Sequence, residues 1–154
     1  MALLLLTACS SPATESSSTA VADTDTAASG ALNKRSGIIT SLCFLRTEGK
    51  SNMDTTNVQL VIKGDTVSGE MDWRPYQKDG RKGVLEGKMH GDTARVLWTF
   101  KQEGVTDTLG LNFKLDSSRL VQRPLKLNKK TGRQQTDESA GYSVVYRPSV
   151  GSRK

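Results

Sequence analysis

Residues 57–73, NVQLVIKGDTVSGEMDW, decide the fold of this chain. Gly64 and Asp65 have the composition of a two-residue hairpin turn, because glycine supplies the positive φ that such turns need. A turn at this pair places Leu60 opposite Gly69 and leaves apolar residues alternating with polar ones along both strands. Alternation with period two is typical of a strand with one buried face. The stretch therefore predicts an antiparallel β-hairpin.

The same pattern returns in residues 83–100, GVLEGKMHGDTARVLWTF. A turn at its Gly-Asp pair places Leu85 opposite Trp98 and puts Gly87 on the inward face, as Gly69 is in the first hairpin. Glycine inside a strand marks a bend, a bulge or a close approach of another backbone. A sheet that curls into a barrel uses inward glycines in this way. We therefore expect a curved sheet, with bulges in a flat sandwich as the alternative.

The rest of the chain adds further strands. Ile38–Leu45 is apolar on both faces and opens the domain, and Thr47–Thr56 is a polar loop. Leu120–Leu127 is a strand in which Pro124 indicates an edge or a bend. A polar loop follows over residues 128–140, and the last strand is expected over residues 141–147.

The turn at Lys101–Gly104 keeps the inward face in register with the following strand. Residues of that strand predicted to point inward are Val105, Asp107, Leu109, Leu111, Phe113 and Leu115. By the same parity Gln122 lies beside Phe113. Asp107 is the unusual member, because a buried carboxylate needs a partner. It either contacts a ligand at the mouth of a cavity or lies at the rim in water.

Together these patterns predict an all-β domain, an antiparallel up-and-down meander of about eight strands. Closing such a meander into a barrel hides its edges. A barrel of this size is filled by side chains or holds one small ligand, and its general appearance is similar to lipocalin-like and avidin-like barrels. A two-sheet sandwich is the alternative architecture.

The start of the chain predicts where the protein is located in the cell. Residues 1–9, MALLLLTAC, are a short apolar run that ends in a lipobox and Cys9, as in a bacterial lipoprotein signal peptide. Residues 10–36 are a disordered tether rich in Ser, Thr and Ala, residues 37–150 the barrel, and residues 151–154 a basic tail. We expect Cys9 to carry a lipid that anchors the protein to a membrane of the cell envelope. A disulfide between Cys9 and Cys43 is the other use of this sulfur.

The charge and the motif content of the sequence limit the classes of function that we expect for this protein. The net charge of +6 favours anionic partners such as lipid head groups. The basic run Lys126–Arg133 has no aromatic residue to stack on a base, so no nucleic acid partner is expected. We see no nucleophile–base pair, metal-ligand cluster or phosphate-binding loop, and His90 is the one histidine. The sequence therefore predicts neither an enzyme nor a cofactor nor a metal site.

Candidate ligand contacts come from inward aromatic and polar positions and from the connection between the hairpins, since loops often carry binding functions. The inward aromatics are either core or ligand walls. The candidates are Trp73, Tyr76, Trp98, Asp107, Phe113 and Gln122.

Three runs, GDTVSGEM at 64–71, KGVLEGKMHGDT at 82–93 and FKQEG at 100–104, resemble a family of small uncharacterised Bacteroidetes cell-envelope lipoproteins with a single β-rich domain. The resemblance covers roughly Leu42 to Gln122. It implies a lipid anchor and a β domain, and carries no catalytic residues. The first function hypothesis is a lipid-anchored binding module for a small apolar or amphipathic molecule. The alternative is a protein-interaction lipoprotein, such as a hydrolase inhibitor or an accessory subunit of an envelope assembly.

Overall fold

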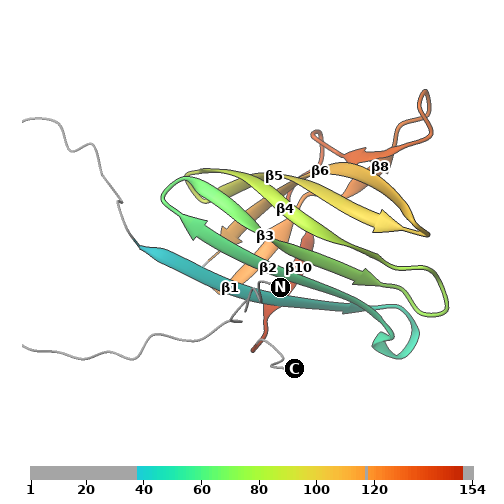
Figure 1. Cartoon of the computed structure of the whole chain (residues 1–154), viewed down its shortest axis with the longest axis horizontal. Coiled ribbons are helices and arrows are strands. Elements are labelled where there is room, and N and C mark those ends of the chain that lie inside the picture. Colours follow the sequence, from blue (N-terminus) through green and yellow to red (C-terminus); the bar gives the residue numbers. More distant parts are fainter. Residues whose placement is uncertain (1–37, 117, 151–154) are drawn as a thin grey trace, which may run out of the picture.

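A computed structural model describes residues 38–116 and 118–150, and these form a closed antiparallel β-barrel (Figure 1). The strands follow one another around the barrel in the order β1, β10, β7, β6, β5, β4, β3, β2, and β8 and β9 form a separate two-stranded sheet. The predicted all-β meander is confirmed, and the sandwich is wrong. The strands are β1 (Ile39–Glu48), β2 (Asp54–Lys63), β3 (Thr66–Arg74), β4 (Arg81–His90), β5 (Thr93–Gln102), β6 (Val105–Asp116), β7 (Arg119–Gln122), β8 (Leu125–Leu127), β9 (Gln134–Thr136) and β10 (Val144–Pro148).

Two-residue turns set the register of the first two hairpins as predicted. Leu60 pairs with Gly69, and Leu85 pairs with Trp98. Gly64 has a φ of 62° and Gly91 a φ of 64°. The aspartate that follows each glycine is not in the left-handed region, which is the φ pattern of a type II′ turn. The predicted inward faces of both hairpins follow from these pairings.

Inward glycines occur where neighbouring strands approach most closely. A Cβ atom on Gly69 would lie 1.9 Å from the carbonyl oxygen of Gln59, and one on Gly83 would lie 1.9 Å from that of Thr99. At Gly87 the distance to the Arg95 oxygen would be 2.0 Å. Side chains at these positions would push β3 and β4 away from their neighbours. The glycines therefore permit the tight curvature of the barrel wall.

The turn between β5 and β6 is built differently. Glu103 has a φ of 49° and Gly104 a φ of 81°. Positive φ at both central residues is the pattern of a type I′ turn, which favours Asn-Gly over other pairs. A glutamate in this region is strained, and the nearby Asp79 carboxyl raises the pKa of Glu103.

Replacing Glu103 with asparagine is expected to stabilise the barrel by about 0.5–1 kcal/mol, because asparagine tolerates the left-handed conformation and removes the carboxyl next to Asp79. Chemical denaturation measures the change. Glu103→Ala is the control, since it removes the charge without relieving the backbone. Equal stabilisation by both substitutions would show that charge rather than φ limits this turn.

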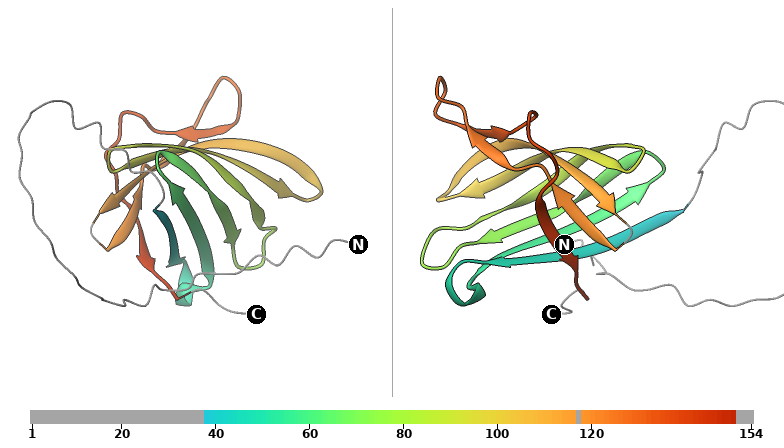
Figure 2. Two further views of the ribbon diagram at one scale, coloured as in Figure 1. Left: turned by 60° about the vertical axis from the view of Figure 1, so that its left-hand side comes forward. Right: turned by 180° about the vertical axis from the view of Figure 1, so that it is seen from behind.

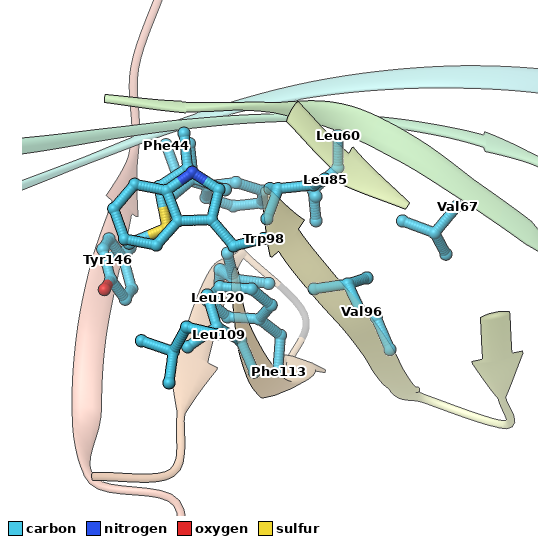
Figure 3. Packing of buried hydrophobic residues seen from close by; sticks show 14 of the residues in the cluster. Phe44, Leu60, Val67, Leu85, Val96, Trp98, Leu109, Phe113, Leu120 and Tyr146 are labelled. Carbon is cyan, nitrogen blue, oxygen red and sulfur yellow. The ribbon is translucent and has the colours of Figure 1, made fainter. Parts of the chain in front are cut away.

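Most of the barrel interior is packed with side chains. Trp98, Phe113 and Leu120 point inward from β5, β6 and β7 (Figure 3). The ring centroids of Trp98 and Phe100 are 4.4 Å apart, and Phe113 meets Tyr146 edge to face at 6.1 Å. The largest fully buried side chains are those of Val58, Leu60, Val67, Leu85, Leu111, Phe113 and Leu120. Over most of its length the barrel is thus filled.

Several predicted boundaries differ from the structure. Half of Thr47–Thr56 is strand, because β1 continues to Glu48 and β2 begins at Asp54, with a single 3-10 turn, η1 (Lys50–Asn52), between them. The last strand, expected over residues 141–147, is β10 at Val144–Pro148. The predicted strand 120–127 breaks, because Pro124 has no N–H for the ladder and the chain leaves the barrel after β7. The predicted loop 128–140 contains β9.

The β8–β9 hairpin packs on the outer side of β6 and projects from the barrel wall (Figure 2). The Thr136 hydroxyl donates to the Gly110 carbonyl at 2.8 Å, and the Asn112 side-chain amide donates to the Glu138 carboxylate at 2.8 Å. Lys126 forms an ion pair with Asp137 at 2.8 Å and, with Ser139, lowers the pKa of this carboxyl to about 2. These contacts fix the hairpin beside one end of the barrel.

The antiparallel topology gives the barrel two ends. We call the end with the β2–β3 and β4–β5 turns and the start of β1 the base. The other end, with η1, the β3–β4 connection and the β5–β6 turn, is the mouth.

Candidate functional site: the mouth cavity

The inward face of the barrel changes from apolar to charged toward the mouth. On β1, Leu42 and Phe44 are followed at the same parity by Arg46 and Glu48, and Arg46 pairs with Thr56 of β2. A cavity of about 250 Å³ opens among these side chains. Its apolar wall is formed by Met71, Trp73, Trp98, Leu109, Leu111 and Val144. Its polar rim is formed by Arg46, Glu48, Arg81 and Gln134, and Gln122 and Tyr146 add polar groups deeper inside.

Arg81 is held tightly at the rim. Its guanidinium lies over the rings of Trp73 and Phe100, at 5.2 and 5.1 Å from their centroids. Its Nε donates to the Gln102 side-chain oxygen at 2.7 Å, and its Nη1 donates to the Gln134 side-chain oxygen at 2.7 Å. Arg81 thereby joins the barrel to β9, so the hairpin forms one wall of the cavity.

A buried polar pair lies deeper. The Tyr146 hydroxyl donates to the Gln122 side-chain oxygen at 2.6 Å, and both residues are almost fully buried. Burial raises the pKa of Tyr146, so the hydroxyl stays protonated and remains a donor. Nearby, Arg46 and Glu48 form an ion pair on the inward face of β1.

The barrel seam runs beside the cavity. β1 pairs with β10 only at Phe44 with Pro148 and at Leu45 with Arg147. The described register continues no further toward the mouth, so the wall between Arg46 and Val144 has no backbone ladder. The cavity is therefore lined on this side by side chains alone.

Two further hollows flank the cavity. One of about 360 Å³ is lined by Asp107, Gln102 and Arg133. The backbone N–H of Thr108 and then the Arg133 guanidinium lower the pKa of the Asp107 carboxyl. The Asp107 side chain is half-exposed, which places it at the rim. The other hollow, of about 510 Å³, lies beneath the β3–β4 connection and includes Tyr76.

The structure brings together three of the six candidate contacts. Trp73, Trp98 and Gln122 line the mouth cavity. Phe113 is fully buried in the packed core and does not line it, while Asp107 and Tyr76 line the flanking hollows.

Sequence reasoning missed three charged contributors, Arg46, Glu48 and Arg81. The period-two parity that identified Leu42 and Phe44 extends to Arg46 and Glu48. The polar composition of Thr47–Thr56 predicts a loop, and this prediction hides the continued alternation of β1 through Arg46 and Glu48. Residues 74–82 are predicted to form a basic connection between the hairpins, whereas Arg81 is the first residue of β4 and lies on the inward face.

Cys9 lies outside the described residues. Cys43, on β1, is nearly buried and is disulfide-bonded in the structure. A sulfur in a disulfide cannot also carry a lipid thioether. If Cys9 is the partner of Cys43, the predicted anchor and this bond are therefore mutually exclusive.

The sequence matches no protein-family model, and comparisons with curated proteins and with solved structures give no significant match. The resemblance to Bacteroidetes lipoproteins stays a prediction. Within residues 38–116 and 118–150, no helix is long and apolar enough to cross a membrane. The same residues contain no group of three or more His, Cys, Asp or Glu side chains placed to hold a metal ion.

Proposed function

We propose that this protein is a binding module that holds a small amphipathic molecule in the mouth cavity. The observation that carries the proposal is the composition of the cavity: an aromatic and aliphatic wall below a rim of converging polar groups. Ligand sites combine an apolar lining with a few placed polar groups in this way, usually over about 300–1,000 Å³. A volume of about 250 Å³ suits a small molecule or one end of a longer one.

Membrane attachment through a lipid on Cys9 is part of the proposal. β1 begins at the base, so the chain that precedes it joins the barrel opposite the mouth. An anchor that reaches the barrel from this end would not obstruct the mouth. Intact-mass measurement of protein from its own cells decides between a lipid on Cys9 and a disulfide, and Cys9→Ser should release the protein from membranes. Continued sedimentation of that variant with membranes would overturn the anchor.

The cavity itself is tested by filling it. Val144 lines the cavity, whereas Val145, the next residue on β10, points outward and is 38 % exposed. Val144→Phe should displace the ligand, and Val145→Phe adds the same side chain to the outer face as a matched control. Native mass spectrometry of protein purified gently from its own cells identifies any retained molecule.

The expected result is a bound small molecule on the unaltered protein and on the Val145→Phe variant, lost from the Val144→Phe variant. Retention by both variants would place the ligand elsewhere. An unaltered protein that folds normally and carries nothing would overturn the proposal and favour the protein-interaction alternative.

A further inference from the structure

The charges at the rim are unevenly matched. Arg46 is paired with Glu48, and Arg133 is paired with Asp107. Among the described residues no carboxylate lies within ion-pair distance of Arg81, whose two side-chain hydrogen bonds go to neutral amides of Gln102 and Gln134. The charged residues that line the cavity are two arginines and one glutamate. The lining of the mouth cavity therefore carries one more positive than negative charge. The carboxylate nearest to balancing it is Asp107 in the adjoining hollow, whose pKa is lowered mainly by a backbone hydrogen bond and by Arg133, and also by Arg81.

Arg81 is also fixed in place. Two aromatic rings and two amide acceptors hold its guanidinium at the rim. Those two hydrogen bonds use two of the five N–H groups of an arginine. A guanidinium ordered in advance loses little side-chain entropy on binding an anion, and its planar array of donors matches a carboxylate.

The wall below Arg81 determines what the rest of a ligand must be. Trp73 and Trp98, with Met71 beneath, offer aromatic and thioether surfaces at the inner side of the cavity. Resting on the proposed binding function, we propose that the ligand is a small carboxylate with an apolar tail, whose carboxylate binds Arg81 and whose tail lies against Trp73 and Trp98.

The test uses three probes with eight-carbon chains that differ in head group: octanoate, octanol and octyltrimethylammonium. The two tryptophans of the chain both line the cavity, so intrinsic fluorescence of the full chain reports binding there, and calorimetry gives the affinity. Octanoate is expected to bind about tenfold more tightly than octanol, as one charge-assisted hydrogen bond would give. Added salt should lower the affinity for octanoate and leave the affinity for octanol unchanged.

Substitutions at Arg81 and Lys82 test which side chain binds the carboxylate of the probe. Arg81→Gln should reduce octanoate affinity to that of octanol, and Arg81→Lys should restore part of it. Lys82→Gln is the matched control, since it removes one positive charge from the exposed neighbouring position on β4. It should leave both affinities unchanged. Because the comparison of octanoate with octanol needs only the unaltered protein, it stands even where an Arg81 variant fails to fold.

The outcomes separate this inference from the proposed function. If octanoate and octanol bind equally well, or if the ammonium probe binds best, the inference that the ligand is an anion is wrong. The proposal that the cavity binds a small molecule would still stand. If none of the probes binds after the natural ligand has been removed, although that ligand itself binds again, the ligand is not a carboxylate with an apolar tail. Loss of octanoate affinity in Lys82→Gln to the same extent as in Arg81→Gln would mean that general surface charge, and not Arg81, attracts the anion.

Discussion

Replacing Gly87 with alanine is expected to lower the free energy of unfolding by about 3 kcal/mol or more. The new Cβ would lie 2.0 Å from the Arg95 carbonyl oxygen and 2.7 Å from the Val96 Cα. Both are backbone atoms of the paired strand and cannot rotate away, so β4 and β5 must separate or the hairpin must shift. Overpacking of this kind typically costs about 1–3 kcal/mol where side chains can yield, and here they cannot. Thermal unfolding should show a melting temperature lower by roughly 10 °C or more.

Gly110→Ala is the matched control. Gly110 lies on β6, and a Cβ added there would have no atom within 4 Å, so alanine should change stability by less than about 0.5 kcal/mol. If neither variant loses stability relative to the unaltered protein, β4 and β5 do not approach each other closely at Gly87. Equal loss in both would show that alanine is unfavourable anywhere in this sheet.

The hairpins were predictable from sequence because their turns are short. A two-residue turn leaves one register, and period-two alternation then assigns every side chain to a face. That logic placed Trp98 opposite Leu85, as the structure shows. The predicted turn at Lys101–Gly104 is two residues shorter in the structure, which pairs Phe100 with Asp107 and keeps the predicted inward parity. It needed no information about the rest of the chain.

The mouth was not predictable in the same way. Inward positions there are polar, because water and not core surrounds them, so hydropathy alternation disappears where β1 reaches Glu48 and β2 begins at Asp54. The β8–β9 hairpin is stabilised by long-range contacts, such as that of Gln134 with Arg81. The sequence of a three-residue strand contains no local pattern that predicts such a contact. The cavity therefore belongs to the part of the fold that only tertiary structure reveals.

Whether the barrel is hollow or filled depended on side-chain volumes that alternation does not specify. The sequence allowed Phe113 to be either a ligand contact or core. In the structure it is fully buried and packs edge to face on Tyr146, and it does not itself line the mouth cavity. The proposed ligand site therefore does not include Phe113, and Phe113 becomes a test of how the barrel core is packed.

Phe113→Ala is expected to cost about 3–5 kcal/mol of stability, because it removes a large buried ring and leaves a cavity that the rigid strands cannot close. Chemical denaturation measures this loss. Val105→Ala, at an exposed position on the same strand, is the control and should change stability by less than about 0.5 kcal/mol. A loss below about 1 kcal/mol for Phe113→Ala would mean that the barrel core is loosely packed. The interior could then hold a ligand much larger than the mouth cavity admits, and the division into a packed core below and a binding site above would be wrong.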